Sequence, residues 1–265
     1  MFLRILSTAR YVTVPVFCCM ISHARTDVGR ARKINQDSVF ASSEPFGVLP
    51  ILFFVADGMG GHKAGDVASR YAVKELVQMA EYSKIKDPVL FLRVAIEEVN
   101  SMLFDEAANN PDLDGMGTTL VAAVIVDNTL YVANVGDSRL YLLRDNLEQI
   151  TRDHSLVEEM VALGKMERGS DEYRSQKNVI TRAVGILPTV DVDMFDIPLQ
   201  ECDYILMCSD GLTNMVSDEE ICKILQTTDL LEEQTDNLIR KANENGGLDN
   251  IAVVLVEPQI SEVIV

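Results

Sequence analysis

Residues 51–62, ILFFVADGMGGH, run from an uninterrupted apolar segment into an aspartate, three glycines and one of the three histidines of the chain. A short apolar run that ends in turn residues predicts a buried strand. Because a strand end is fixed by its sheet, we expect Asp57 to be rigidly placed. The glycines allow the backbone to turn there and to come close to a bound group. This stretch therefore indicates a site built at the end of a strand.

The same combination of an apolar strand and an acidic residue recurs along the chain. Asp137, Asp210 and Asp249 each adjoin an apolar run and a glycine or asparagine, and Asp37 opens a further strand-like segment. A single Asp-Gly pair usually marks a turn, but this repetition favours a shared site. Carboxylates that converge repel one another unless a cation lies among them. Oxygen ligands of this kind favour Mg²⁺, Mn²⁺ or Ca²⁺.

Two basic side chains near these acids indicate which substrate a cation site would serve. A pair of cations about 3.5–4 Å apart activates a water and typically supports hydrolysis of phosphate esters or peptides. Arg32 lies five residues before Asp37, and a guanidinium group matches phosphate oxygens. His62 lies five residues after Asp57 and can donate a proton to a leaving alkoxide. Taken alone, Arg32 is better interpreted as a surface charge, and His62 is equally well interpreted as an ordinary loop residue. Their closeness in sequence to the acids favours the site roles.

Composition and missing motifs argue against several other functions. The chain of 265 residues carries 23 Lys and Arg against 41 Asp and Glu, which gives a net charge of −18. An excess of negative charge predicts weak attraction to nucleic acids and to anionic membranes. The chain also lacks a G-x-x-x-x-G-K-[ST] phosphate-binding loop and a G-x-S-x-G nucleophile motif. These absences argue against a P-loop enzyme and against a serine hydrolase.

The first residues of the chain allow more than one interpretation. Residues 11–21 are apolar but shorter than the about 20 residues that a membrane span needs, so we expect no stable membrane insertion. Residues 1–19 form an N-terminal extension, which is either signal-like or precedes a true start at Met20, and we favour the second interpretation. The five cysteines include no C-x-x-C pair and are interpreted as buried thiols of a reducing compartment. This usage predicts a cytoplasmic protein.

The order of the expected elements predicts the fold class. Amphipathic spacing predicts helices over residues 64–82 and 87–108, and residues 165–178 are polar without a strong period. The other expected elements are strands near residues 20–26, 37–41, 50–56, 118–126, 129–135, 138–145, 179–184, 191–197, 203–208 and 251–256, and helices near 155–163, 217–226 and 229–244. Hairpin-linked strands and paired helices favour an α+β fold in which helices cover two antiparallel sheets.

Eight motifs of the chain form a specific ordered series. They are DVGRARKINQD, VADGMGGHKAG, GTTLVAAVI, VANVGDSRLYLLR, TRDHSLVEEMVALG, NVITRAVG, CSDGL and DNIAVVLV. Over residues 22–256 this series resembles the metal-dependent type 2C protein serine/threonine phosphatases in their compact bacterial form. The resemblance implies a four-layer α-β-β-α sandwich of two antiparallel sheets flanked by helix pairs. It also implies a catalytic domain over residues 20–258, followed by a tail over residues 259–265.

The resemblance further implies which residues hold the metal ions. It places a centre of two Mn²⁺ or Mg²⁺ ions in a cleft at one edge of the sheets. Asp57 would bridge both ions, and the carbonyl of Gly58 would assist it. Asp210 and Asp249 would complete the coordination of one of the ions, and Asp37 would hold metal-bound water. These assignments agree with the cation site expected from the repeated acids.

The remaining roles are also taken from the resemblance. Asp137 matches the acid that binds a weaker third ion together with Asp210 in bacterial members of the family. Arg32 matches the arginine that binds the substrate phosphate, and His62 matches the proposed general acid. Residues 165–178 match the flap, a segment that shapes access of the substrate, and their composition agrees with mobility.

The resulting hypothesis is a protein phosphatase that hydrolyses phosphoserine and phosphothreonine by direct attack of metal-activated water, without a phosphoenzyme. Its expected partners are phosphorylated proteins and a cognate serine/threonine kinase, and we expect a monomer. One alternative is a catalytically silent relative that binds phosphoproteins, but the presence of Asp57, Asp210 and Asp249 argues against it. A second alternative is a metallohydrolase that acts on small phosphate esters.

Overall fold

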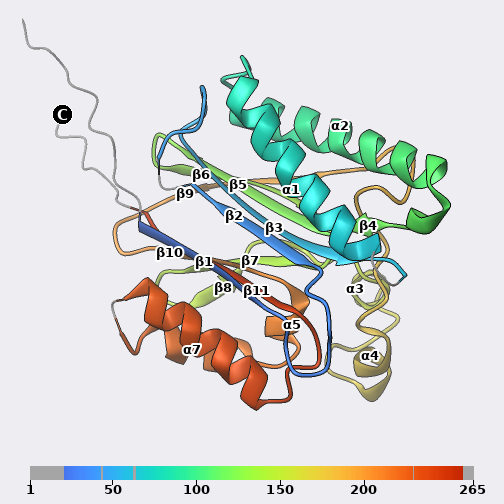
Figure 1. The fold of residues 1–265 in the computed structure, drawn as a ribbon. Helices are drawn as coiled ribbons and strands as arrows, with labels where there is room; N and C mark the ends of the chain where they lie inside the picture. Colours follow the sequence, from blue (N-terminus) through green and yellow to red (C-terminus); the bar gives the residue numbers. More distant parts are fainter. Residues whose placement is uncertain (1–20, 43, 62–63, 229, 259–265) are drawn as a thin grey trace, which may run out of the picture.

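Two antiparallel β-sheets lie face to face at the centre of the molecule, and helices cover their outer faces (Figure 1). The computed structural model describes residues 21–42, 44–61, 64–228 and 230–258. The six-stranded sheet has the strand order β2-β3-β5-β6-β9, and β4 pairs with β3. The five-stranded sheet has the strand order β1-β11-β10-β7-β8.

The bounds of the elements are as follows. The six-stranded sheet contains β2 (Asp37–Ala41), β3 (Ile51–Met59), β4 (Gly117–Thr118), β5 (Leu120–Val126), β6 (Thr129–Val135) and β9 (Asp193–Pro198). The five-stranded sheet contains β1 (Ile21–Asp27), β7 (Arg139–Leu143), β8 (Leu147–Gln149), β10 (Tyr204–Cys208) and β11 (Ile251–Glu257). The helices are α1 (Ala64–Tyr82), α2 (Pro88–Asn109), the 3₁₀ helix η1 (Pro111–Leu113), α3 (Leu156–Ala162), α4 (Asp171–Gln176), α5 (Asp210–Thr213), α6 (Asp218–Leu225) and α7 (Leu231–Glu244).

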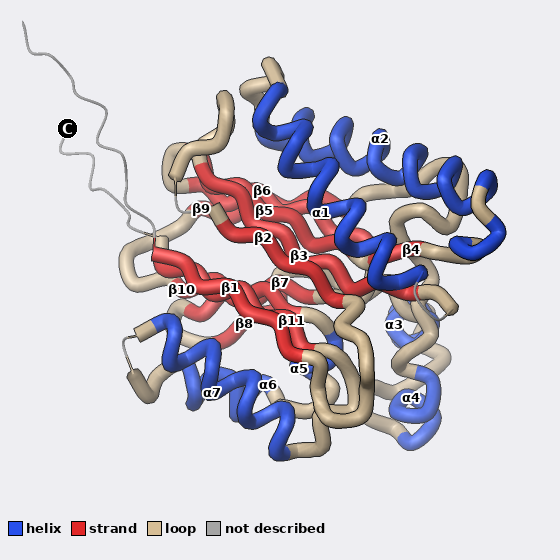
Figure 2. Tube along the Cα trace, viewed as in Figure 1, coloured by secondary structure: helices blue, strands red, loops and turns tan. Residues whose placement is uncertain are grey.

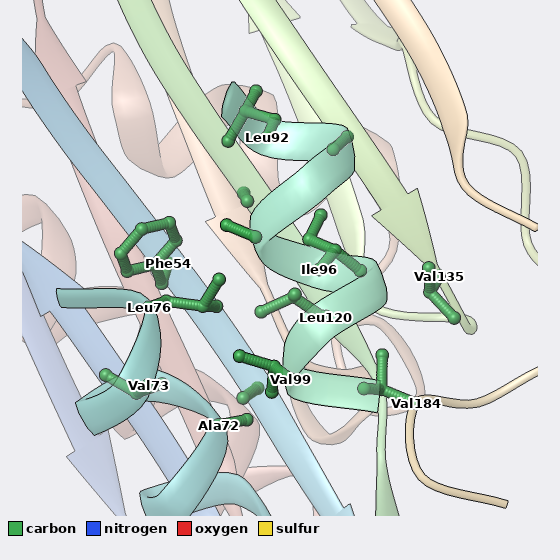
Figure 3. Packing of buried hydrophobic residues seen from close by; sticks show 14 of the residues in the cluster. Phe54, Ala72, Val73, Leu76, Leu92, Ile96, Val99, Leu120, Val135 and Val184 are labelled. Carbon is green, nitrogen blue, oxygen red and sulfur yellow. The ribbon is translucent and has the colours of Figure 1, made fainter. Parts of the chain in front are cut away.

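Helices and strands form four layers (Figure 2). Apolar side chains fill the three spaces between these layers. Successive residues of a strand point to opposite faces. Phe54 of β3 therefore lies beside Leu76 of α1, in the same apolar cluster as Ile96 of α2 (Figure 3). Phe53 faces the other way, into the space between the sheets. Because both faces of β3 are covered, its sequence is apolar throughout. This layering confirms the predicted α-β-β-α sandwich.

Local signals in the sequence explain several element ends. Asp127 and Asn128 have φ values of 47° and 61° and form the two-residue turn between β5 and β6. Short polar residues tolerate this conformation, which matches the twist of a hairpin. Helix α2 begins after Asp87, whose side chain accepts a hydrogen bond from the Leu90 amide at 2.8 Å, and Pro88 occupies the first helical position. The predicted turn and helix start are therefore confirmed.

The prediction of a strand over residues 179–184 is wrong. Ile180 and Val184 each make one isolated bridge, to Ser155 and Thr118 respectively. A ladder needs a partner strand of several residues, but β4 offers only two residues and is already paired with β3. The chain then turns away at Gly185, where φ is 90°.

The polar segment 165–178 contains a short helix that the sequence pattern did not predict. Helix α4 begins after Ser170, whose side chain accepts a hydrogen bond from the Tyr173 amide at 3.1 Å. Asp171 and Glu172 in its first turn suit the positive end of the helix dipole. This helix is started by its cap rather than by apolar periodicity, which explains why a search for a hydrophobic period missed it.

Two expectations about the character of the chain can be compared with the structure. None of the helices within the described ranges has both the length and the apolar character that crossing a bilayer requires. Cys208 is buried in β10, but Cys202 is exposed, so the interpretation of all cysteines as buried thiols is wrong. The remaining expectations about residues 1–19 and 259–265 concern segments outside the described residues.

Phe53→Ala should lower the free energy of unfolding by about 3–5 kcal/mol, because the ring is fully buried between two sheets that cannot close the resulting cavity. Chemical denaturation followed by circular dichroism measures the change. Tyr82→Ala is a matched control, because Tyr82 is 71% exposed and its loss should cost less than about 0.5 kcal/mol. A loss below about 1 kcal/mol for Phe53→Ala would contradict the packing between the sheets.

Candidate metal centre

Asp37 and Asp57 are directly opposite each other on the neighbouring strands β2 and β3. Opposite residues of an antiparallel pair have Cβ atoms about 4.5–5.5 Å apart. Thr119 fixes the Asp57 backbone: its Oγ1 accepts a hydrogen bond from the Asp57 amide at 3.0 Å, and its amide donates to the Asp57 carbonyl at 2.8 Å. The six-stranded sheet therefore brings two acids to one place.

The five-stranded sheet contributes Asp210 and Asp249 to the same region. Asp210 is the first residue of α5, just after β10, and Asp249 lies just before β11, which pairs with β10. A Cβ atom on Gly211 would lie 1.8 Å from the Asn250 carbonyl oxygen. Only glycine allows the segments that carry these two acids to approach so closely.

Ser209 connects the acids of the two sheets. Its Oγ donates a hydrogen bond to Asp37 Oδ2 at 2.7 Å and accepts one from the Ala252 amide at 2.9 Å. The serine is fully buried, so these contacts are not shared with solvent. Sequence reasoning did not single out Ser209. Its position directly before Asp210 in the motif CSDGL was the available signal.

Burial and the charges of neighbouring acids raise the pKa values of Asp37 and Asp57. Burial raises the pKa of Asp37 from 3.8 to about 7, and the charges of Asp210 and Asp249 add to the rise. Burial also raises the pKa of Asp57 well above its ordinary value, and the charges of Asp37, Asp210 and Asp137 add to it. The ionisation of Asp37 and of Asp57 thus depends on charges from both sheets, so these acids share one electrostatic environment.

The donor set fits hydrated divalent cations. Asp37 Oδ1 and Asp137 Oδ1 are buried and have no hydrogen-bond partner within the described ranges, whereas buried polar atoms ordinarily have one. In the same part of the chain, no three His, Cys, Asp or Glu side chains converge closely enough to hold an ion between them as they stand. Mg²⁺-like ions need only one or two carboxylates each and keep several waters. The acids therefore fit water-rich coordination better than a closed protein cage.

Arg32 reaches this set of acids from the loop between β1 and β2, which crosses from one sheet to the other (Figure 1). Its Nη2 donates a hydrogen bond to Asp249 Oδ2 at 2.8 Å, and its side chain remains 51% exposed. Arg25 by contrast pairs with Asp236 of α7. The contact with Asp249 distinguishes Arg32 from an isolated surface charge and leaves much of its guanidinium group open to solvent beside the carboxylates.

Asn250 holds the Arg32 loop in place. Its Nδ2 donates hydrogen bonds to the carbonyls of Val28 and Ile34 at 2.9 and 3.0 Å, and its Oδ1 accepts one from the Gln36 amide at 2.8 Å. The amide and the carbonyl oxygen of the Asn250 side chain thus both bind the loop between β1 and β2. The position of this loop therefore depends on Asn250, the neighbour of Asp249. Sequence reasoning assigned no role to Asn250, although it lies within the motif DNIAVVLV.

Asp137 lies in the connection between β6 and β7, and His154 supports that connection. Burial raises the pKa of Asp137 to about 8, and the charge of Asp210 adds to the rise. His154 Nδ1 accepts a hydrogen bond from the Gly136 amide at 3.0 Å, and its Nε2 lies 3.1 Å from Asp193 Oδ2. Burial lowers the pKa of His154, which keeps the imidazole neutral. Sequence reasoning assigned no role to His154, although it lies within the motif TRDHSLVEEMVALG.

The predicted roles of Gly58 as a carbonyl ligand and of His62 as a proton donor rest on the sequence alone. A Cβ atom on Gly58 would lie 1.9 Å from the Gly65 carbonyl oxygen, so β3 passes directly against the first turn of α1. The Gly58 amide donates a hydrogen bond to the Gln36 carbonyl at 3.0 Å. Its role as a carbonyl ligand stays a prediction. His62 lies outside the described residues, so its role as a proton donor also stays a prediction.

Comparisons with known proteins identify the family of the chain. The family model for Protein phosphatase 2C matches residues 28–251. The serine/threonine phosphatase stp of Listeria monocytogenes is 44% identical over 253 residues, which cover 92% of this chain and 98% of the relative. The protein phosphatase PhpP of Streptococcus pneumoniae is 39% identical over 239 residues, which cover 87% of this chain and 94% of the relative.

Solved structures show the same relationship. The serine/threonine phosphatase PstP/Ppp of Mycobacterium tuberculosis has a TM-score of 0.82 at 36% identity, over 91% of this chain and 99% of that one. The catalytic domain of PstP in complex with two manganese ions has a TM-score of 0.79 at 36% identity, over 90% of this chain and 97% of that one. By sequence and by fold, the chain therefore belongs to the protein phosphatase 2C family and is a protein phosphatase.

Proposed function

We propose that the chain hydrolyses phosphoserine and phosphothreonine esters of proteins by direct attack of water, at a centre of two Mn²⁺ or Mg²⁺ ions. The observation that carries this proposal is the shared burial of acids from both sheets, whose charges destabilise one another without a cation. The relatives named serine/threonine phosphatase and the PstP structure with two manganese ions support the substrate class and the dependence on a divalent metal.

The acids have distinct proposed roles. When bound, a pair of such ions supplies a nucleophilic water near neutral pH and neutralises part of the charge of a phosphate dianion. Ser209 occupies Oδ2 of Asp37 and leaves the buried Oδ1 to accept a hydrogen bond from a water. Asp37 thereby orients a water rather than binding an ion directly. The residues proposed to hold the two ions are Asp57, the Gly58 carbonyl, Asp210 and Asp249.

Groups at the rim of the centre complete the proposed site. Arg32 binds the substrate phosphate, because its half-exposed guanidinium group already lies at a carboxylate of the centre. His62 donates the proton to the leaving alkoxide, a role that rests on its place five residues after Asp57. Asp137 and Asp210 hold a weaker third ion. Residues 165–178 form the flap that controls access of the substrate.

The wider setting of the activity is also a proposal. We propose that residues 20–258 form the catalytic domain and that the enzyme acts as a cytoplasmic monomer that opposes a serine/threonine kinase. The absence of a C-x-x-C pair and the reduced, buried Cys208 support a reducing compartment. A phosphothreonine peptide set against nucleotides and sugar phosphates at equal concentration tests the substrate class, and a preference for the small esters would contradict it.

Asp57→Asn should remove the response to Mn²⁺ while stabilising the metal-free protein. The substitution deletes one buried charge from a set of repelling acids, so the metal-free melting temperature should rise by about 2–4 °C or more. Mn²⁺ should then no longer raise the melting temperature, and hydrolysis of a phosphothreonine peptide should be lost. Asp145→Asn, at an exposed carboxylate of the β7–β8 turn, should change none of these quantities. An Asp57→Asn variant that keeps Mn²⁺-dependent activity would contradict the assignment.

In chelator, the free energy of unfolding should decrease as the pH rises from about 4 to about 8. The folded pKa values of Asp37 and Asp137, about 7 and about 8, exceed the ordinary 3.8, so the folded state binds more protons across this window. The lowered pKa of His154 acts in the opposite direction near pH 6. Denaturant titrations at several pH values, on the wild type and on the D37N/D137N variant, measure how much the two acids contribute to the pH dependence of the free energy of unfolding. An equal slope in both proteins would contradict the prediction.

Arg32→Ala should raise KM for a phosphothreonine peptide by about 10–100-fold and change kcat less, because charge-assisted hydrogen bonds to phosphate are worth about 1.5–3 kcal/mol. Arg32→Lys should give an intermediate KM, since an ammonium group lacks the fork that matches two phosphate oxygens. Arg25→Ala is the matched control, because Arg25 pairs with Asp236 and should not contact substrate. Steady-state kinetics with Mn²⁺ decide the outcome, and an unchanged KM for Arg32→Ala would remove the proposed phosphate contact.

A further inference from the structure

A cavity of about 170 Å³ borders the metal centre on the side of the flap. Asp137 and Asp210 line it from the sheets, and Tyr173 and Lys177 line it from the flap. The cavity has room for several waters, because one water needs only about 10–15 Å³ of such space. A divalent ion that keeps several waters and contacts two carboxylates fits such a space. Asp137 Oδ1, buried and without a hydrogen-bond partner within the described ranges, is a suitable ligand.

The cationic side chains that line this cavity differ in their other contacts. Arg139 is fully engaged, because it donates hydrogen bonds to both Asp153 oxygens at 2.7–3.0 Å and to the Tyr141 hydroxyl at 2.8 Å. Lys177 is half-buried and makes no direct ion pair within the part of the chain that the structure describes. Burial is the main cause that raises the pKa of Asp210, and the charges of Lys177 and Arg139 oppose this rise. Lys177 therefore lines the cavity beside the two acids without a direct ion pair within the described ranges, and its charge acts on Asp210.

Glu158 fixes the flap that carries Lys177. Arg168 donates hydrogen bonds to both carboxylate oxygens of Glu158, one of them at 3.0 Å. The Tyr173 hydroxyl donates to the same carboxylate at 2.7 Å. Glu158 lies on α3, Arg168 lies just before α4, and Tyr173 lies within α4. The Glu158 side chain is only 10% exposed, so these charge-assisted bonds are partly shielded from water and fix α4, which ends next to Lys177.

We propose that Lys177 is a built-in counter-cation for Asp137 and Asp210. The hydrogen bonds that Glu158 accepts from Arg168 and Tyr173 of the flap, here called the Glu158 clip, position this lysine. An additional divalent cation then binds in this cavity only by displacing Lys177. The inference rests on the proposed function, because it concerns the weaker third ion of that centre. An ammonium group and a divalent cation compete for the same two carboxylates. By linkage, Lys177 lowers the affinity of the cavity for the cation, and a bound cation weakens the interaction of Lys177 with the acids by the same factor.

Binding of Mn²⁺ to Lys177→Gln tests the competition directly. Electron paramagnetic resonance of free Mn²⁺ during a titration counts the bound ions and gives the affinity of each site. Lys177→Gln should raise the affinity of the weakest site by about tenfold or more and leave the two tight sites unchanged. Glu158→Gln, which weakens the clip, should raise it by about two- to fivefold.

Matched variants assign the effect to the cavity. Lys165 is an exposed lysine of the same flap and Glu159 is an exposed glutamate of the same helix, so Lys165→Gln and Glu159→Gln should leave the weakest site unchanged. The D137N/K177Q double variant should lose the gain that K177Q shows alone. A double variant that keeps the gain would place the ion outside this cavity and would overturn the proposal.

Chemical labelling of the wild-type protein provides a measurement that no variant can obscure by misfolding. Acylation of Lys177, followed by mass spectrometry, should increase at Mn²⁺ concentrations that fill the weakest site, but not at those that fill only the two tight sites. Lys165, labelled in the same sample, should not respond.

The outcomes separate this inference from the proposed function. Suppose that the protein binds two Mn²⁺ ions tightly and hydrolyses the phosphopeptide. If Lys177→Gln then leaves the affinity of the weakest site unchanged, or if the labelling of Lys177 does not change with Mn²⁺, the proposed role of Lys177 is overturned and the proposed function is not. A wild-type chain that binds no Mn²⁺ would overturn the proposed function and this inference together.

Discussion

Repulsion among buried carboxylates is the constraint on which the rest of the structure depends. Asp37, Asp57 and Asp210 lie in a shared space where burial and neighbouring charges oppose their ionisation. Such an arrangement weakens the metal-free fold and gains free energy when a cation neutralises it. The remaining features of the site either hold these acids together or supply positive charge to them. Binding of cations and stability of the fold are therefore coupled at this place.

The sandwich holds the acids together by fixing their backbones rather than by pairing their charges. Asp37 and Asp57 are opposite each other in the register of one sheet, whereas Asp210 and Asp249 follow and precede neighbouring strands of the other. Ser209 joins the two sheets through its hydrogen bond to Asp37. Extensive apolar layers on both sides of β3 stabilise this arrangement and offset the repulsion. A loop-built site would relax under the same repulsion, because its backbone is not held by a sheet.

Positive charge reaches the acids from segments outside the sheets. Arg32 lies on the loop between β1 and β2 and contacts Asp249. Lys177 lies beyond α4 and lines a cavity together with Asp210. Each cation is carried by a segment that another side chain fixes: Asn250 for the Arg32 loop and Glu158 for the flap. The centre thus combines acids held by the two sheets with positive groups held on segments outside them.

The sequence by itself determined the strands, the long helices and the positions of the acids. These depend on local signals: apolar runs, Asp-Gly pairs and caps such as Asp87, which act over a few residues. Only the tertiary structure decided which groups meet, because Ser209 and Asp37 lie 172 residues apart and no local pattern specifies a partner at that distance. For the same reason residues 179–184 resembled a strand but found only isolated bridges, and Lys177 could not be placed opposite Asp210 before the flap was folded.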